Sequence, residues 1–158
     1  MAISLFVYLL ALVCWLGGMF FFTAIIAPVV FKVLPIADAG KLVAGLFPRY
    51  YILGYIAGAV GVALAIYFAV ERPPRLWWSL SALALAAALG LTIYAGAIVR
   101  PQVDAIRSVV EEQNPDPARR AEFDRLHRLS VMLNGGVMLL NLAALLATAT
   151  ALTPNGSG

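Results

Sequence analysis

Four long apolar stretches constrain the fold of this chain more than any other feature of its sequence. They cover residues 3–31, 51–70, 76–99 and 129–152. Each supplies the roughly 20 residues that an α-helix needs to cross a hydrocarbon core about 30 Å thick. A helix satisfies its own backbone amides in lipid, whereas an open sheet does not. The sequence therefore predicts an all-α fold: an integral membrane antiparallel four-helix bundle.

Composition supports a membrane protein of one domain. Of the 158 residues, 63% are hydrophobic and 12% are charged, against about 45–50% and about 25% in soluble domains. We expect one four-span domain over residues 1–153 and a disordered tail over 154–158. The net charge of +3 is too small to indicate a nucleic-acid partner. With a single cysteine, Cys14, and a single histidine, protein side chains alone predict no disulfide and no metal site.

The distribution of positive charge predicts how the chain is oriented. Only Arg72 and Arg75 lie in the short connection between the second and third stretches. Cytoplasmic loops carry the excess of Lys and Arg, so we expect a plasma (bacterial inner) membrane protein with both termini outside and the longer connections cytoplasmic. The cations of those longer connections are Lys32, Lys41, Arg49, Arg100, Arg107, Arg119, Arg120, Arg125 and Arg128.

The third and fourth helices are expected to continue beyond the membrane as a cytoplasmic helical hairpin. Apolar residues keep helical spacing after Pro101, and Asp116 with Pro117 is a typical N-cap and first helical residue. The tip is expected near residues 114–117. Antiparallel pairing about this tip predicts ion pairs of Glu111 with Arg119 and of Asp104 with Arg125 or Arg128.

The second helix has two alternative starting points and a packing motif. Asp38 is a candidate N-cap for a segment that continues through Pro48 into the span; the alternative is an interfacial helix broken at Pro48. Gly54-x-x-x-Gly58 predicts a close helix contact. Whether such contacts lie within one chain or in a homo-oligomer is left open. The same expectation extends to Gly17, Gly18, Gly90, Gly96, Gly135 and Gly136.

The fourth helix carries the main candidate site. His127, Ser130, Asn134 and Asn141 recur at spacings of three, four and seven residues, which predicts one polar stripe facing the bundle. Polar groups in a membrane are functional candidates by default, although Ser and Asn also bond helices together. Antiparallel pairing of the third and fourth helices places Arg100 at the depth of His127. The functional interpretation is a polar pocket open to the cytoplasm, with Arg100 binding an anion.

An internal match adds two residues to this candidate site. LFPRYYILGYIAG at 46–58 aligns with EFDRLHRLSVMLN at 122–134, which sets Arg49 against Arg125 and Tyr51 against His127. A parallel duplication and a coincidence are both open interpretations. The predicted ligand-binding residues are therefore Arg100, His127, Ser130, Asn134, Arg49, Tyr51 and Asn141.

Several motifs together resemble a known family. They are W-x-G at 15–17, FKVLP at 31–35, LFPRYY at 46–51, VRP at 99–101 and FDRLHRLSVMLN at 123–134. This pattern resembles the transmembrane protein 205-like family, catalogued in bacteria as a membrane domain of unknown function, and implies four spans. It is more distantly similar to copper-resistance D-type proteins and to a haem-associated protoporphyrinogen oxidase family, which rely on additional histidines.

Three functions are compatible with these features. The first is a non-enzymatic protein that binds or translocates a small molecule, lipid or metal complex through the polar pocket, with membrane lipids as partners. The second is a haem-associated redox protein, in which His127 is the one available axial ligand. The third is a scaffold that acts through the hairpin. The first is the main hypothesis, and no catalytic residue is predicted.

Overall fold

Four long apolar helices build the protein. The computed structural model describes residues 1–110, 112 and 116–153, and it contains no strand among them. The helices are Ala2–Val33, Ile36–Glu71, Arg75–Val109 and Pro117–Leu152. Each is long and apolar enough to cross a membrane. The prediction of an all-α, four-span, multi-pass membrane protein is therefore confirmed by length and composition, and residues 154–158 of the predicted tail lie outside the described residues.

Two of the four spans change helical form along their length. The second and fourth spans are the single helices α3 (Ile36–Glu71) and α6 (Pro117–Leu152). The first and third spans are each interrupted by a short π-helical segment. The first comprises α1 (Ala2–Phe21), π-helical η1 (Phe22–Ile26) and α2 (Ala27–Val33). The third comprises α4 (Arg75–Tyr94), π-helical η2 (Ala95–Val99), α5 (Arg100–Ile106) and the 3₁₀ turn η3 (Arg107–Val110).

Proline explains where the two π-helical segments lie. Pro28 follows η1 and Pro101 follows η2, each within the first two residues of the next α-helix. Proline has no N–H to donate, and its ring clashes with the carbonyl four residues earlier. That carbonyl belongs to Ala24 in η1 and to Ala97 in η2. Wider π turns relieve the clash locally, so the helix continues instead of breaking.

The N-cap predicted from the sequence differs from the observed one in α3 and agrees with it in α6. α3 begins at Ile36 with Pro35 at its N-cap, and Asp38 lies in the first turn without capping it. Asp38 as the N-cap was therefore wrong, but the helix does continue through Pro48, as one alternative predicted. α6 has Asp116 at its N-cap, where the carboxylate accepts from Ala118 N at 3.3 Å.

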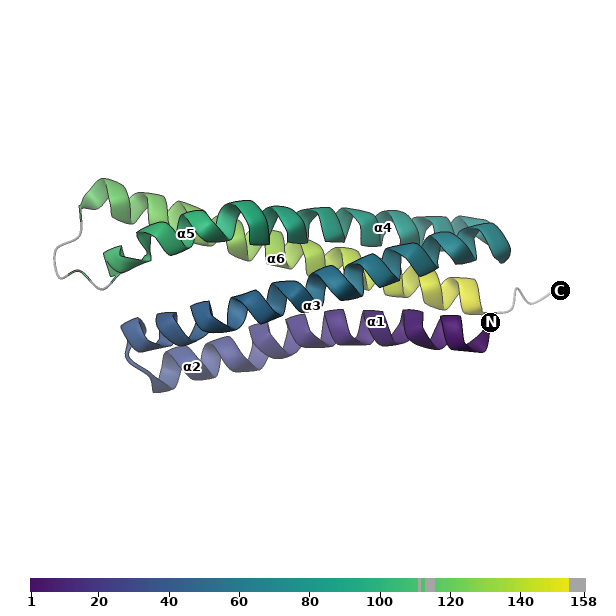
Figure 1. Cartoon of the computed structure of the whole chain (residues 1–158), viewed down its shortest axis with the longest axis horizontal. Coiled ribbons are helices and arrows are strands. Elements are labelled where there is room, and N and C mark those ends of the chain that lie inside the picture. Colours follow the sequence, from purple (N-terminus) through teal and green to yellow (C-terminus); the bar gives the residue numbers. More distant parts are fainter. Residues whose placement is uncertain (111, 113–115, 154–158) are drawn as a thin grey trace.

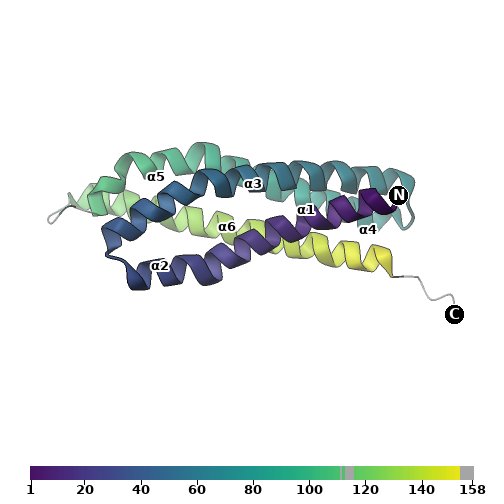
Figure 2. The same cartoon turned by 60° about the horizontal axis from the view of Figure 1, so that its bottom comes forward.

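The helices form a ring in the order α1, α3, α4, α6 (Figure 1). α4 packs extensively on both α3 and α6, whereas α1 and α6 close the ring with far less contact. The two termini and the turn at 72–74 lie at one end, here called the terminal end (Figure 2). The α2–α3 connection, η3 and the start of α6 lie at the other, the hairpin end. Toward the hairpin end, α2 diverges from the start of α6 (Figures 1 and 2). The start of α3 stays joined to η3, because Arg107 Nη1 donates to the carbonyl of Gly40 at 3.5 Å.

The predicted hairpin is present, but its ion pairs differ from the predicted ones. α5 and η3 run antiparallel to the first turns of α6. Asp104 pairs within its own segment, at 3.4 Å from Arg100 Nε and 4.0 Å from Arg107 Nη1. Pairs at i,i+3 and i,i+4 satisfy this carboxylate locally, so the expected pair with Arg125 or Arg128 was wrong. Glu111 and residues 114–115 of the tip lie outside the described residues; Arg119 pairs with Glu112 at 3.0 Å.

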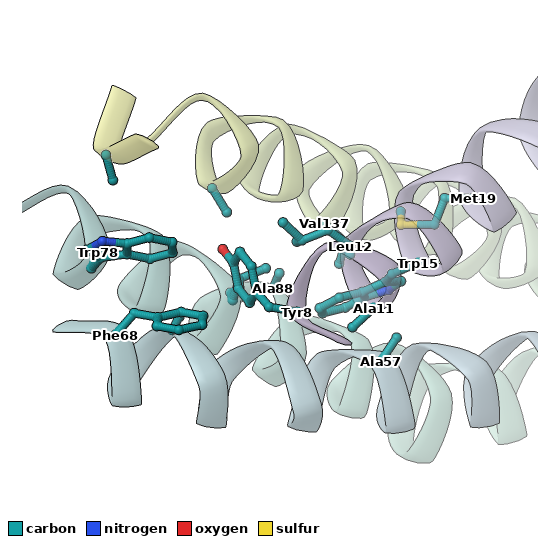
Figure 3. Close-up of a cluster of buried hydrophobic side chains, with 14 residues drawn as sticks. Tyr8, Ala11, Leu12, Trp15, Met19, Ala57, Phe68, Trp78, Ala88 and Val137 are labelled. Atoms are coloured by element: carbon teal, nitrogen blue, oxygen red, sulfur yellow. The ribbon is translucent and has the colours of Figure 1, made fainter. Parts of the chain in front are cut away.

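Glycines admit a large aromatic side chain into the core. A Cβ on Gly58 would lie 2.9 Å from Trp15 Cη2, and one on Gly54 would lie 3.3 Å from Trp15 Nε1. The predicted close contact at Gly54-x-x-x-Gly58 is thus confirmed as an intrachain contact with α1. Close neighbours also surround Gly18, Gly96 and Gly136, whereas Gly17, Gly90 and Gly135 have none within 4 Å. Figure 3 shows Trp15 in the same buried cluster as Tyr8, Phe68 and Trp78.

Candidate functional site

A small polar cavity lies inside the bundle, in the half nearer the hairpin end. All four spans contribute to its wall. Its volume is about 20 Å³, which is enough for one water molecule. The lining residues are Trp15, Tyr50, Tyr51, Gly54, Thr92, Ala95, Ser130, Asn134 and Val137. Three of the predicted site residues, Tyr51, Ser130 and Asn134, are therefore brought together here.

Asn134 is the centre of a hydrogen-bond network at this cavity. Tyr50 donates its hydroxyl to Asn134 Oδ1. Asn134 Nδ2 in turn donates to Thr23 Oγ1 at 3.2 Å. The network joins α3, α6 and η1, which are far apart in the sequence. Sequence analysis missed Tyr50 and Thr23, because nothing in the chain order indicates that they meet Asn134.

Two further hydroxyl groups of the cavity wall donate hydrogen bonds to their own helices. Ser130 donates to the carbonyl of Leu126 at 3.0 Å, and Thr92 donates to that of Ala88 at 2.8 Å. A hydroxyl that donates to the preceding turn keeps lone pairs with which it can accept. Ser130 and Thr92 can therefore each accept a hydrogen bond from a molecule in the cavity.

Both π-helical segments lie at the level of the cavity. Ala95, the first residue of η2, lines it, and Thr23 of η1 bonds to Asn134. Gly96 of η2 also faces Tyr51, since a Cβ there would lie 2.7 Å from the ring. Single π turns within α-helices occur frequently at functional sites. The signal in the sequence was a proline inside each of two apolar spans, Pro28 and Pro101.

Arg100 stands on the hairpin side of the cavity. Its side chain is 27% exposed and lies 3.4 Å from Asp104 through Nε, an atom that makes no hydrogen bond. Both Arg100 and Asp104 are near enough to Tyr51 to interact with it electrostatically. Tyr51 thus lines the cavity and also lies near this half-buried ion pair. An incoming anion would compete with Asp104 for the guanidinium.

The structure places His127 outside the cavity. His127 is exposed and stacks on Phe123, with 6.1 Å between ring centroids and 6° between planes. The spacing of seven residues puts it on the same face of α6 as Asn134. The expectation that it faces the bundle interior was wrong, because its side chain is exposed on the surface of the bundle.

The two remaining predicted residues lie away from the cavity. Arg49 is exposed, and its guanidinium bonds to the carbonyl of Gly45 on its own helix at 3.4 Å. Asn141 is fully buried beyond Val137, to whose carbonyl its Nδ2 donates at 3.0 Å. Asn141 Oδ1 has no hydrogen-bond partner. Such an orphaned acceptor is unfavourable in a membrane interior.

A second polar cluster, which sequence analysis did not identify, lies in the half nearer the terminal end. Tyr8 Oη lies 2.7 Å from Ser81 Oγ and 2.7 Å from Thr148 Oγ1. Ser81 and Thr148 are 3.2 Å apart, and both can donate to the carbonyl of Ala144. These three buried hydroxyls bond α1, α4 and α6 to one another. Tyr8 also contacts Phe68 and Trp78 edge to face (Figure 3).

The donor set of the cavity does not suit haem or a metal ion. Within the described ranges, no three His, Cys, Asp or Glu side chains group together. His127 is on the outer surface, so the cavity wall has no imidazole for an axial bond to haem iron. Its polar groups are instead hydroxyls, an amide and an indole, which recognise neutral hydrogen-bonding groups.

Comparison with known proteins returns one family. The family described as "Domain of unknown function (DUF4149)" matches residues 10–112, which is well over half of the chain. This region includes most of the first three spans and their share of the cavity. No curated protein and no solved structure matches the chain. The expected membrane domain of unknown function is thus supported, whereas the transmembrane protein 205-like and copper-resistance D-type names are not confirmed.

Proposed function

The chain belongs to the DUF4149 family, whose function is unknown, and we propose that it is a membrane protein that binds a small hydrogen-bonding molecule in its internal cavity. The observation that carries the proposal is the cavity wall itself, in which polar side chains from different spans converge on one small cavity. Ligand sites are commonly concave, mostly apolar and fixed by a few convergent polar groups. Trp15, Tyr51, Ser130 and Asn134 give this cavity that character.

Comparison with the second polar cluster supports a role for the cavity beyond helix contact. At Tyr8, Ser81 and Thr148 the hydroxyls bond directly to each other at 2.7–3.2 Å. That arrangement is typical of polar side chains that hold membrane helices together. Ser130, by contrast, bonds only to its own helix and faces a cavity. A role in packing alone accounts for the Tyr8 cluster and for the bonds of Asn134 to Tyr50 and Thr23, but it does not account for a cavity beside Ser130.

The size of the cavity implies a closed state. About 20 Å³ accommodates a water molecule and nothing larger. A larger molecule requires Tyr50 or Tyr51 to move, and the flanking π-helical segments η1 and η2 are natural places for the backbone to adjust. Binding from the hairpin side is favoured, because the bonded cluster at Tyr8 holds the other half of the bundle together. This argument supports binding over passage through the bundle.

We also propose that the hairpin end faces the cytoplasm. The nine cations of the two longer connections belong to the hairpin half, whereas Arg72 and Arg75 lie at the terminal end. The excess of Lys and Arg marks the cytoplasmic side. Both termini are then outside, and the cavity opens toward the cytoplasmic leaflet. Labelling of single introduced cysteines from either side tests this orientation.

Native mass spectrometry of the purified protein in mild detergent tests binding directly. Ser130→Val fills the cavity with two methyl groups, while Thr150→Val makes a similar change on the exposed face of the same helix. Thr150 is a matched control because its hydroxyl also bonds to the preceding turn, at 2.9 Å from the carbonyl of Leu146. We expect a small-molecule adduct on the wild type and on Thr150→Val, reduced about tenfold on Ser130→Val. Equal adducts on all three proteins, or none on the wild type, would refute the proposal.

A further inference from the structure

The side of the bundle between η1 and α6 exposes polar groups where apolar ones are expected. Thr23 is exposed, and its hydrogen bond with Asn134 lies at the surface of the bundle. Large apolar residues lie one helical turn away on the same faces: Phe20 before Thr23 and Val131 before Asn134, which are 60% and 58% exposed. Polar groups that face lipid are unfavourable unless they have a role. This surface is also the weakly packed side of the ring, between α1 and α6.

This polar surface lies about two helical turns inside the nearest cations of the hairpin end. Thr23 lies nine residues before Lys32, and Asn134 lies six residues after Arg128. At 1.5 Å per residue these separations are roughly 13 Å and 9 Å. Thr23 and Asn134 therefore lie deeper in the membrane than the Lys and Arg side chains of the hairpin end. A lipid can reach them without leaving the bilayer.

Two arginines near this surface in the sequence have no described acidic partner and can bind an anion. Arg128 adjoins His127 on α6, and Arg49 adjoins Tyr50 on α3; both arginines are exposed. No described carboxylate pairs with either, although Arg119, Arg120 and Arg125 each have an acidic partner on the hairpin. Arginine binds phosphate readily through charge-assisted hydrogen bonds.

We infer that the molecule bound is a phospholipid with an anionic head group, which reaches the Tyr50–Asn134 network from the bilayer between η1 and α6. The inference rests on the proposed function and names its ligand. The polar part of the head group bonds to Thr23, Asn134 and Tyr50, while Arg49 and Arg128 attract the phosphate. The acyl chains remain in the bilayer along the apolar surface of α1 and α6.

The groove between α4 and α6 provides the control for ordinary lipid contact. It has a volume of about 380 Å³ and lies in the other half of the bundle. Its lining is apolar apart from the Trp77 indole and includes Ala87 and Ala143, so it offers nothing that selects a head group. Ala87→Leu fills this groove without touching the polar surface at Thr23.

The test is native mass spectrometry with defined lipids added to the delipidated protein. Phosphatidylglycerol and phosphatidylcholine with identical acyl chains are compared, together with soluble glycerol 3-phosphate. We expect phosphatidylglycerol to bind about tenfold more strongly than phosphatidylcholine. Thr23→Val and Asn134→Leu reduce that binding about tenfold, and the double variant Arg49→Gln, Arg128→Gln removes the preference between the two lipids. Ala87→Leu leaves binding unchanged, and circular dichroism confirms that each variant is folded.

Three outcomes overturn the inference. Equal binding of the two lipids to the wild type contradicts selection of an anionic head group. Displacement of the lipid by glycerol 3-phosphate means that a soluble phosphate ester is the ligand and that the bilayer is not its route. Loss of binding in Ala87→Leu, with none in Thr23→Val, places the lipid in the other groove. If any one of these outcomes occurs while Ser130→Val still loses an adduct other than the phospholipid, the proposed function stands and only the identity of the ligand is wrong.

Discussion

Replacement of Gly58 by alanine tests how closely α1 packs against α3. A Cβ at this position would lie 2.9 Å from Trp15 Cη2 and 2.9 Å from Leu89 Cδ1. The tip of Leu89 can rotate away at little cost. Trp15 can move only at a cost in packing, because it is 3% exposed and makes a second close contact at Gly54. Gly58→Ala must therefore displace the indole from the cavity wall.

The size of the effect follows from comparison with Gly135→Ala, where an added Cβ has no neighbour within 4 Å. Both substitutions gain about 0.5–1 kcal/mol of helix preference. Only Gly58→Ala also overpacks the core, which costs about 1–3 kcal/mol. We therefore expect its free energy of unfolding to be about 1–3 kcal/mol below that of Gly135→Ala. For a chain of this size, that difference corresponds to a Tm lower by roughly 2–12 °C.

Thermal unfolding in mild detergent, followed by far-ultraviolet circular dichroism, measures this difference. Intrinsic fluorescence gives a second readout, since displacement of Trp15 changes the polarity around its indole. A Tm for Gly58→Ala equal to or above that of Gly135→Ala would show that Trp15 is not wedged between α1 and α3. Trp15 would then not be a fixed part of the cavity wall.

Two further predictions concern the terminal end and the orientation. Tyr8→Phe removes one hydroxyl of the buried cluster, while Ser81 and Thr148 keep their hydrogen bonds to the carbonyl of Ala144. We therefore expect the free energy of unfolding to fall by only about 1 kcal/mol. Tyr67→Phe, at a side chain that is 45% exposed, is the control, and equal Tm values for the two variants would argue against the cluster. In a cysteine-free background, a membrane-impermeant maleimide added to intact cells should label Arg72→Cys and not Arg119→Cys. The reverse pattern would place the hairpin end outside.

The hairpin illustrates how far local sequence determines structure. Asp116 and Pro117 begin α6 as predicted, because a cap depends on residues within one turn of each other. The ion pairs between the two arms depended on the relative height of two separate helices. Asp104 instead forms ion pairs with Arg100 and Arg107 of its own segment. Neighbours in the chain are already close, so such pairs form at a smaller entropic cost.

Of the residues predicted for the candidate site, the structure brings some together at the cavity and places others elsewhere. Ser130, Asn134 and Tyr51 line the cavity, and Arg100 stands beside it. Helical periodicity correctly placed His127 on the face of Asn134, but periodicity does not indicate whether a neighbouring helix still covers that face.

The sequence by itself determined the number of spans, their helical form and the cap at Asp116, because these depend on apolar length and on contacts within a turn. It also contained the cause of both π-helical segments, in Pro28 and Pro101. Only the tertiary structure decided that Asn134 meets Tyr50, 84 residues away, and Thr23, 111 residues away. Those meetings depend on the rotation and height of each helix against its neighbours, which side-chain packing fixes across the whole bundle.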